Sequence, residues 1–389
     1  MTKSIAKDLP TRGNGPIRWG REDPPVSRRT IPAANYSDPD RFALEREVVR
    51  RSWQLACHVS ELAEPGDTVL FEAYDETVAI VRQPDGTVKA WHNVCQHRGT
   101  RLVCEPVRGA KRFVCPYHFW VYGLDGALTG VPGRKHFDPG RLSALSTPQV
   151  AVEERLGWIW VNLSPDPRPL GEMLAEIDGE LAPFDLAEAK LLAPVKEFLV
   201  PSNWKRGLEA FIEIYHASML HKDSIPEGSV DCAGTSYRLF ERNSMMVYPM
   251  SETVVQLERT LDHQRYASMQ CMVFPNINFN LTPTAFQVYD FLPVSVDQTR
   301  MRLWVLSGPS VEYSPQEARA VCDYVDTVFG EDIFICGEQA RTAKSSGIKE
   351  VILGDEECRI THFFATLDRD IAELAGPERH DRLPQAKSE

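Results

Sequence analysis

The chain has 389 residues, of which 43% are apolar and 25% are charged, so it is long enough for two domains with substantial cores. Its net charge of −12 argues against nucleic acid as a partner, because phosphate binding needs a basic surface. We expect no membrane segment and no secretory signal, since no apolar run is long enough, and the nine irregularly spaced cysteines favour a reducing cytoplasm.

The first part of the chain is predicted to form an arm, a helix and a small β domain. Residues 1–40 are rich in Pro, Gly and Arg, which predicts an extended or mobile arm. A helical pattern over residues 39–52 follows it. Short Val- and Trp-rich runs, separated by turns such as Pro84-Asp85-Gly86, then predict strands. These strands are expected at residues 53–58, 68–71, 78–82, 88–92, 113–115 and 158–163.

Two thiol–imidazole pairs lie in this β region. Cys95 and His97 form a Cys-x-His pair, and Cys115 and His118 form a Cys-x-x-His pair, with seventeen residues between His97 and Cys115. Two cysteines and two histidines suit either a zinc ion or a [2Fe–2S] cluster with mixed ligands. Imidazole in place of thiolate raises the reduction potential of a cluster, so the second alternative predicts a one-electron carrier.

Basic residues surround these pairs. Between residues 98 and 141 the chain has eight Lys or Arg and only three acids, Glu105, Asp125 and Asp138. One hypothesis is that this basic collar docks an acidic electron donor such as a ferredoxin. The alternative is a solvated loop surface without a role. The basic residues are Arg98, Arg101, Arg108, Lys111, Arg112, Arg134, Lys135 and Arg141.

The second part of the chain is predicted to be an α+β domain. Three prolines within residues 165–169 mark the boundary. Helical patterns cover residues 170–184, 204–220, 314–329 and 360–374. Strands are expected at residues 196–200, 237–240, 254–257, 271–274, 286–292 and 301–306. We therefore expect an antiparallel sheet with flanking helices.

The segment from Asn203 to His221 contains a second candidate metal site. Glu213 precedes His216 by three residues, and His221 follows five residues later. Positions i and i+5 lie about 140° apart on a regular helix, so the two histidines converge only at a helix end or an irregular turn. Otherwise they are unrelated histidines on an amphipathic helix. A mononuclear Fe(II) that activates O₂ needs two histidines and one carboxylate. Asp332 is the candidate acid, with Glu331, Asp326 and Glu338 as competitors.

Residues 36–374 resemble the large (α) subunit of the Rieske non-haem iron oxygenases, the aromatic-ring-hydroxylating oxygenase family. Several runs carry the resemblance across both parts of the chain, so it does not depend on a single short motif. They are Trp53 with Glu61-Leu62 and Pro65-Gly66-Asp67, Asn93-Val94-Cys95-Gln96-His97-Arg98-Gly99, Asn203-Trp204-Lys205 with Tyr215-His216 and His221, Phe274-Pro275-Asn276, and Glu331-Asp332-Ile333 with Cys336 and Ser345.

The resemblance implies two domains and two iron sites. An all-β Rieske domain is expected at residues 41–165, its first helix contributing to the catalytic domain at residues 166–389. Each subunit would carry one [2Fe–2S] cluster and one Fe(II). Cys95 and Cys115 would hold one iron of the cluster, and His97 and His118 the other. The ligands of the Fe(II) would be His216, His221 and Asp332.

The implied function is that of a terminal oxygenase. Such a component takes electrons from a ferredoxin or a flavin-dependent reductase and uses O₂ to hydroxylate a small, here aromatic, substrate. The alternatives are a monooxygenase that demethylates its substrate or acts on a quaternary amine, and an electron carrier without oxygenase activity. A head-to-tail homotrimer, with or without a small subunit, is also implied.

Three positions depart from the family pattern: Glu213 replaces the usual Asp, Ala210 a common Asn and Phe119 a common Gly. In the family, the acid at position 213 connects a cluster histidine of one subunit to an iron-ligand histidine of its neighbour. A longer acid there resembles the branch that acts on quaternary amines such as carnitine. Asn203 and Tyr215 are expected to support the iron ligands. Candidates to line the pocket are Phe211, Ile212, Met219, Leu220, Phe279, Phe286 and Phe329.

Overall fold

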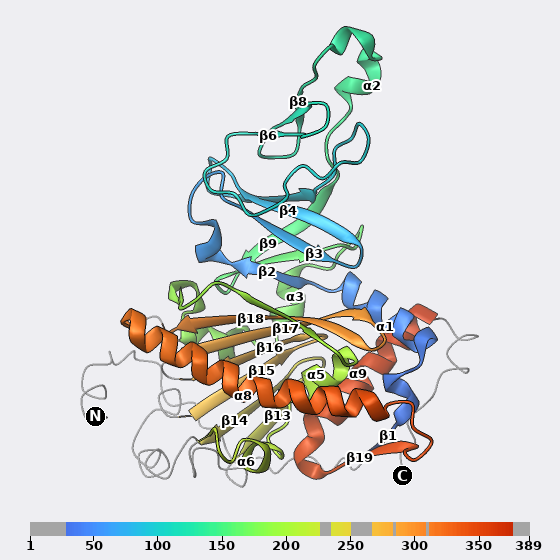
Figure 1. Cartoon of the computed structure of the whole chain (residues 1–389), viewed down its shortest axis with the longest axis vertical. Helices are drawn as coiled ribbons and strands as arrows, with labels where there is room; N and C mark the ends of the chain where they lie inside the picture. Colours follow the sequence, from blue (N-terminus) through green and yellow to red (C-terminus); the bar gives the residue numbers. More distant parts are fainter. Residues whose placement is uncertain (1–28, 226–234, 250–266, 283–284, 309–310, 376–389) are drawn as a thin grey trace. The chain divides into compact units, whose positions relative to one another are not determined.

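The structure is a computed structural model, and it describes residues 29–225, 235–249, 267–282, 285–308 and 311–375. The described residues form two compact units (Figure 1). The first is Arg46–Glu188, and the second combines the residues up to Glu45 with those from Ala189 onward. The expected arm falls mostly outside the described residues. Its residues 29–32 form strand β1 (Arg29–Pro32), which pairs antiparallel with β19 (Glu350–Leu353).

The first unit is built from β-structure, as predicted. Its main sheet is antiparallel with six strands in the order β2-β10-β9-β5-β4-β3, and a small sheet contains β6, β7 and β8. The strands of the main sheet are β2 (Gln54–His58), β3 (Thr68–Ala73), β4 (Glu76–Arg82), β5 (Val88–His92), β9 (Gln149–Arg155) and β10 (Trp158–Asn162). Those of the small sheet are β6 (Phe113–Val114), β7 (Val121–Tyr122) and β8 (Leu128–Gly130).

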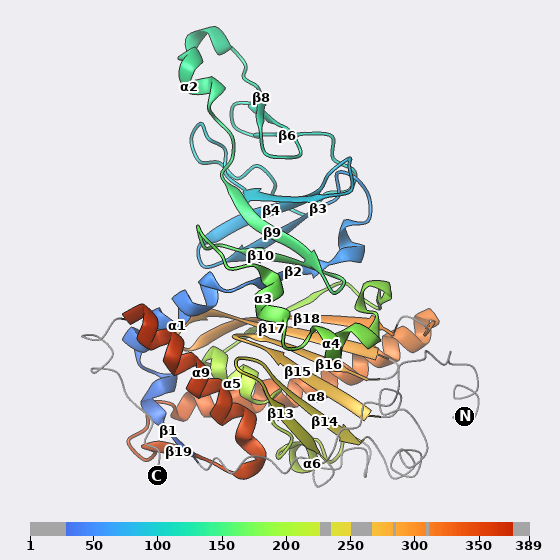
Figure 2. The same ribbon diagram turned by 180° about the vertical axis from the view of Figure 1, so that it is seen from behind.

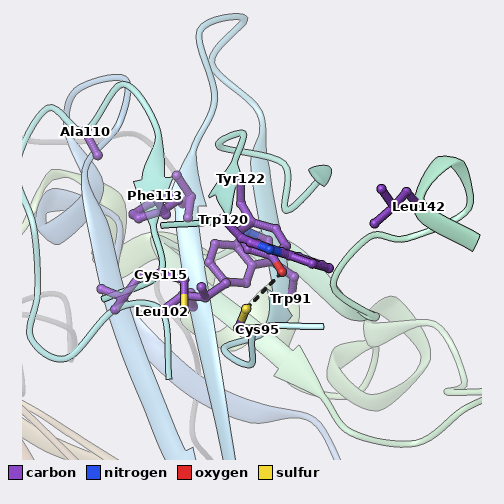
Figure 3. Packing of buried hydrophobic residues seen from close by; sticks show 12 residues of the cluster. Trp91, Cys95, Leu102, Ala110, Phe113, Cys115, Trp120, Tyr122 and Leu142 are labelled. Atoms are coloured by element: carbon purple, nitrogen blue, oxygen red, sulfur yellow. Dashed lines mark hydrogen bonds between the residues drawn. The ribbon is translucent and has the colours of Figure 1, made fainter. Parts of the chain in front are cut away.

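One apolar core joins the small sheet to the main sheet. It contains Trp91 on β5, together with Phe113, Trp120 and Tyr122, and both candidate cysteines lie among these rings (Figure 3). Trp91 and Phe113 pack edge to face with their centroids 5.3 Å apart. The core therefore fixes the loops that carry the thiol–imidazole pairs.

The second unit is the expected antiparallel sheet with helices beside it (Figure 2). Its strand order is β11-β18-β17-β16-β15-β14-β13, and β12 also pairs with β18. The strands are β11 (Lys190–Leu191), β12 (Lys196–Val200), β13 (Ser236–Leu239), β14 (Ser244–Pro249), β15 (Ala267–Val273), β16 (Ile277–Leu281), β17 (Ala285–Ser295) and β18 (Gln298–Ser307). The strand predicted at residues 254–257 lies outside the described residues. Among the helices in the described part of the chain, none is both long and apolar enough to cross a membrane.

Several helices differ from the predictions. The helix expected at residues 314–329 is α8 (Pro315–Thr342), because Gly330 and Gly337 lie within it without ending it. The helix expected at residues 170–184 is broken into α3 (Leu170–Leu174), α4 (Asp178–Leu181) and a 3₁₀ turn that contains Pro183. The predictions for α1 (Pro39–Arg51) and α9 (Cys358–Ala375) are confirmed within two residues; α2 (Pro139–Ser143) was not predicted.

A buried group of charges connects the start of α1 to α5 (Trp204–Glu209). Lys205 and Glu45 form an ion pair, and both side chains are completely buried. Glu45 also accepts hydrogen bonds from Trp204 Nε1 at 3.1 Å and from Arg41 Nε at 2.8 Å. Burial lowers the pKa of Lys205 to about 8, although Glu45 partly offsets the effect. Replacing either residue would therefore leave the charge of the other one buried without this partner.

We expect Lys205→Met to lower the free energy of unfolding of this unit by about 3–5 kcal/mol, because it leaves the buried Glu45 carboxylate without its main partner. Denaturant unfolding measures the change. The double variant Glu45→Gln/Lys205→Met is the control, since it removes both charges. It should lose less stability than the single variant, and a larger loss would contradict the argument.

Candidate metal centres

The two thiol–imidazole pairs lie on two loops that have the same pattern of backbone hydrogen bonds. The carbonyl of Cys95 accepts a hydrogen bond from Gly99 N at 2.9 Å, and that of Cys115 accepts one from Phe119 N at 3.0 Å. The amide of Cys95 bonds to the carbonyl five residues later, and the amide of Cys115 does the same, both at 2.8 Å. Gly99 and Phe119 both have positive φ, at 75° and 60°. The loops are therefore structural equivalents that face one another.

The two cysteines lie deep and the two histidines lie nearer the surface. Cys95 and Cys115 are buried, and Cys95 Sγ is 3.3 Å from the Tyr122 hydroxyl (Figure 3). Burial raises the pKa of the Cys95 thiol. His97 stacks on Trp120, and its Nδ1 lies 3.0 Å from His118 Nδ1.

This arrangement fits a metal held by both imidazoles. Two nitrogens on one tetrahedral metal, at about 2.05 Å each, lie roughly 3.3 Å apart, close to the separation of the two Nδ1 atoms. The pKa of His118 is lowered by desolvation and then by the neighbouring His97 and Arg98. Lowering this pKa favours the neutral imidazole, which is the form that binds metals.

The segment with the second pair of histidines is a broken helix. The single helix predicted at residues 204–220 is wrong, because α5 ends at Glu209 and α6 covers only Ala217–Leu220. His216 is the N-cap of α6 and His221 its C-cap. The Glu213 carboxylate accepts a hydrogen bond from His216 N at 3.2 Å, which holds the turn between the two helices. The histidines thus converge at helix ends, one of the two possibilities that their spacing allowed.

Asp332, on α8, completes a compact group with these histidines. Its Oδ1 lies 3.5 Å from His216 Nε2 and 3.3 Å from His221 Nε2, and the side chain is only 6% exposed. Among the described residues, this oxygen has no partner with hydrogen-bond geometry. One ligand atom from each of the three residues lies within 4.8 Å of the others. Two imidazole nitrogens and a buried carboxylate oxygen that faces both of them suit a divalent metal such as Fe(II).

A second carboxylate lies behind each histidine. Glu213 contacts His216 Nδ1, and Glu331 Oε2 contacts His221 Nδ1 at 2.6 Å. Ser224 Oγ donates a further hydrogen bond of 2.7 Å to Glu331. Both imidazoles are therefore held at Nδ1 and direct Nε2 toward Asp332, an arrangement that orients metal-binding histidines.

These contacts distinguish Asp332 from the other acids that were candidates to bind the metal. Asp332 faces both histidines, whereas Glu331 supports one of them from behind. Asp326 pairs with Lys196 at 2.6 Å, and Glu338 pairs with Arg341 at 3.0 Å. Burial acts to lower the pKa of both histidines, but their carboxylate neighbours raise it above its ordinary value.

Glu331→Gln is expected to weaken iron binding about 10- to 100-fold, because the charge that orients His221 and increases its basicity is removed. Titration of the iron-depleted protein with Fe(II) under anaerobic conditions measures the affinity. Glu338→Gln is the matched control on the same helix and should bind iron as the unmodified protein does. Equal affinities for the two variants would contradict the supporting role of Glu331.

A cavity of about 380 Å³ adjoins the three residues. Strands β14–β17 form one wall, and α8 and residues 210–225 form the other. Phe211 and Phe329 line it, as expected. Ile212, Met219, Phe279 and Phe286 are not among its described lining residues, and Leu220 lines a second cavity of about 200 Å³. The sequence did not predict Tyr248, Gln270, Asn280, Gln287, Tyr289 and Tyr324 as lining residues.

Two predicted supporting residues lie elsewhere. Asn203 is the N-cap of α5, where its side chain accepts from Lys205 N at 3.2 Å and donates to the Val296 carbonyl at 2.8 Å. The Tyr215 side chain is exposed. Neither belongs to the described lining of either cavity. Glu213, by contrast, lies where it was expected, against His216.

Few classes of protein combine a thiol–imidazole site on a small β domain with two histidines and a carboxylate beside a cavity. The first site suits one-electron transfer, and the second suits O₂ activation with open coordination positions. The fold and the two sites thus define an oxygenase of the two-centre iron class.

Comparison with known proteins agrees with this class. Residues 52–149 match the Rieske [2Fe–2S] domain, and residues 182–373 match the catalytic domain of the ring hydroxylating alpha subunit. The chain belongs to the Rieske non-haem iron oxygenases, as a large (α) subunit. It binds a [2Fe–2S] cluster in the first domain and non-haem Fe(II) in the second, which sets aside the structural zinc site and the pure electron carrier.

The relatives include enzymes for amines and for aromatic compounds. The carnitine monooxygenase oxygenase subunit of Escherichia coli is 26% identical over 84% of this chain and 87% of its own length. The glycine betaine monooxygenase oxygenase subunit of Chromohalobacter salexigens is 34% identical over 50% of this chain, but the match spans only 43% of that relative. The large component of a 2,4-dinitrotoluene dioxygenase system from Burkholderia is 32% identical over 50% of this chain and 44% of its own.

Solved structures share the fold. A quaternary ammonium Rieske monooxygenase in complex with L-carnitine has a TM-score of 0.76 at 21% identity, over 88% of this chain and 96% of that one. Naphthalene 1,2-dioxygenase with bound indole has a TM-score of 0.73 at 21% identity, over 92% and 95% of the two chains.

Proposed function

We propose that His216, His221 and Asp332 hold the Fe(II), and that Cys95, Cys115, His97 and His118 hold the cluster. The observation that carries the proposal is the convergence of two imidazole Nε2 atoms on one buried carboxylate oxygen at the wall of a cavity. Bound Fe(II) supplies the O₂-activating chemistry, and the cluster supplies single electrons. The residues of the chain hold the substrate beside the iron, orient the two histidines and limit the access of water.

The favoured substrate is a small methylated amine. Five Phe and Tyr side chains line the cavity, and the described lining residues include no Lys or Arg. Aromatic faces attract cations, whereas an anionic substrate would need a basic partner. The relatives named for carnitine and glycine betaine support this choice. The aromatic residues of the lining are Phe211, Tyr248, Tyr289, Tyr324 and Phe329.

Hydroxylation of an aromatic substrate is the second candidate. The same rings can pack against an arene, and the dinitrotoluene relative supports this alternative. O₂ uptake with a panel of methylated amines and arenes, with analysis of the products, tests both candidates. Formaldehyde or another carbonyl product from an amine supports the first, and a hydroxylated ring supports the second. If no member increases O₂ uptake by an enzyme with a full iron complement, both substrate proposals fail.

Glu213 has a further role in an assembly of several copies. We place the chain in a head-to-tail homotrimer, in which Glu213 accepts a hydrogen bond from the partner subunit's His118. Within one chain, the observations that support this are the exposed Tyr117 and Phe119 beside His118, and the exposed Tyr215 and Met219 near Glu213. Apolar side chains on the surface favour burial against a second protein. A ferredoxin or reductase in the cytoplasm would supply the electrons.

The basic collar, the eight Lys and Arg residues between positions 98 and 141, supports docking of an acidic electron donor. All eight residues are exposed. Arg101 pairs with Glu72 at 2.7 Å and Arg108 with Asp67 at 3.1 Å, so the other six supply most of the positive field.

With limiting electron donor, turnover should fall at least about tenfold between 0.05 and 0.5 M salt, because salt screens attraction between exposed charges. Replacing Arg134 and Lys135 by Gln should reproduce part of this loss at low salt. The control replaces Arg319 and Lys344, which lie on the other unit, by Gln. A rate that does not change with salt would remove the docking proposal.

A further inference from the structure

Three amide side chains form a row across the sheet on the wall of the cavity. Gln270 on β15 pairs with Asn280 on β16, and Asn280 pairs with Gln287 on β17. Residues that are paired across neighbouring strands project from the same face of a sheet. All three amides line the cavity that adjoins the metal-binding residues. We call Gln270, Asn280 and Gln287 the amide row.

Two of the three amide oxygens of the row accept hydrogen bonds from side chains of the same wall. Ser268 Oγ donates to Asn280 Oδ1 at 2.8 Å, and the Tyr289 hydroxyl donates to Gln287 Oε1. Burial raises the pKa of the phenols of Tyr289 and Tyr248 on the same wall, and Asn280 and Gln270 act in the opposite direction.

The amide oxygen of Gln270 is the exception. The residue is only 7% exposed, and among the described residues its Oε1 has no hydrogen-bond partner. A buried acceptor without a partner is unfavourable, and such atoms are uncommon in folded proteins. The residue lines the cavity, so a rotation of its amide group would expose this oxygen to a molecule there, which can supply the missing donor.

We propose that Gln270 Oε1 accepts a hydrogen bond from an O–H or protonated N–H group of the substrate, at the end remote from the carbon that is oxidised. Gln270 belongs to the sheet wall, whereas His216, His221 and Asp332 come from the helical wall. A substrate held at Gln270 therefore extends across the cavity toward the metal. The inference rests on the proposed function and deepens it, since it assigns the residue that orients the substrate.

The substrate class follows from this contact. A compact molecule with a hydroxyl or a protonated amine at one end satisfies the oxygen. A molecule of the same shape with a methyl group there leaves Gln270 Oε1 buried and unpaired. Sites built to bond a donor discriminate strongly against analogues that lack it. Discrimination between such pairs should therefore depend on residue 270.

Two matched pairs of probes test the proposal on the holoenzyme. The first is (2-hydroxyethyl)trimethylammonium against propyltrimethylammonium, and the second is 4-methoxyphenol against 4-methoxytoluene. Titration calorimetry gives the dissociation constants. In at least one pair, the hydroxyl-bearing probe should bind at least about tenfold more tightly than its methyl-bearing counterpart. A preference in the first pair indicates a cationic substrate, and a preference in the second pair indicates an aromatic one. Gln270→Met should reduce the ratio to below about threefold.

Gln339→Met on α8 is the matched control and should leave the ratio unchanged. Gln270→Asn, which shortens the side chain by one methylene, should also reduce the ratio of affinities. It replaces Gln270→Met in the test if the Met variant does not fold. Equal affinities within both pairs, no binding of either hydroxyl-bearing probe, or an unchanged ratio in both Gln270 variants would overturn the inference. O₂ uptake separates it from the proposed function: a ratio that depends on Gln270 without O₂ uptake would retain the binding site and reject the proposed substrates.

Discussion

Asp332→Ala is expected to lower turnover by about 10³-fold or more while the visible spectrum of the cluster stays unchanged. Asp332 is the residue that both His216 Nε2 and His221 Nε2 face, at 3.5 and 3.3 Å. Without its carboxylate, two neutral imidazoles remain, and they hold Fe(II) weakly. The protein should therefore contain only the two irons of its cluster.

Iron and sulfide analysis, a visible spectrum and O₂ uptake together measure this outcome. Asp326→Ala is the control, because Asp326 lies on the same helix and pairs with Lys196 outside the site. It should retain the third iron and its activity. An Asp332→Ala protein that keeps both would show that another group holds the metal.

Glu213→Gln is expected to reduce turnover about 100-fold with both metal sites still filled. Glutamine retains the size of the side chain but lacks the charge that Glu213 places against His216 Nδ1. In the proposed trimer it also weakens the contact with the partner subunit's His118. Stopped-flow absorbance should show slow reoxidation of the reduced cluster on mixing with substrate and O₂.

Glu213→Asp distinguishes loss of charge from loss of length. It restores the residue that is usual in the family and should retain about a third or more of the activity. Iron analysis checks that neither variant has lost its metal. Reoxidation of the cluster at the normal rate in Glu213→Gln would contradict the role of this acid in electron transfer.

The residues proposed to hold the cluster could be singled out from the sequence because their motifs are local. Cys95, His97, Cys115 and His118 lie on two short loops, and their spacing alone indicates a thiol–imidazole site. The contribution of α8 is different, because Asp332 lies more than a hundred residues after His221. Glu331 and Asp332 differ by about 100° on the helix, so both reach the histidines, one from the front and one from behind. Spacing alone cannot assign these two positions.

The lining of the cavity shows a second limit. Phe279 and Phe286 were candidates because they are apolar and lie near the motifs, but their neighbours Asn280 and Gln287 line the cavity. Successive residues on a strand face opposite sides, so a choice that is wrong by one residue selects the wrong face. Both faces of these strands are largely buried, so polarity does not indicate which face adjoins the metal.

The two cysteine loops differ in one way that affects the surface of the protein. Gly99 adopts positive φ without strain, but Phe119 adopts it at a cost of about 1–2 kcal/mol. Phe119 is 64% exposed and lies next to His118 in the chain, so its side chain contributes little to the core. The chain thus retains a less stable loop that displays an aromatic ring next to the outer histidine. Such a ring resembles an anchor residue, the kind of side chain that contributes most when two protein surfaces associate.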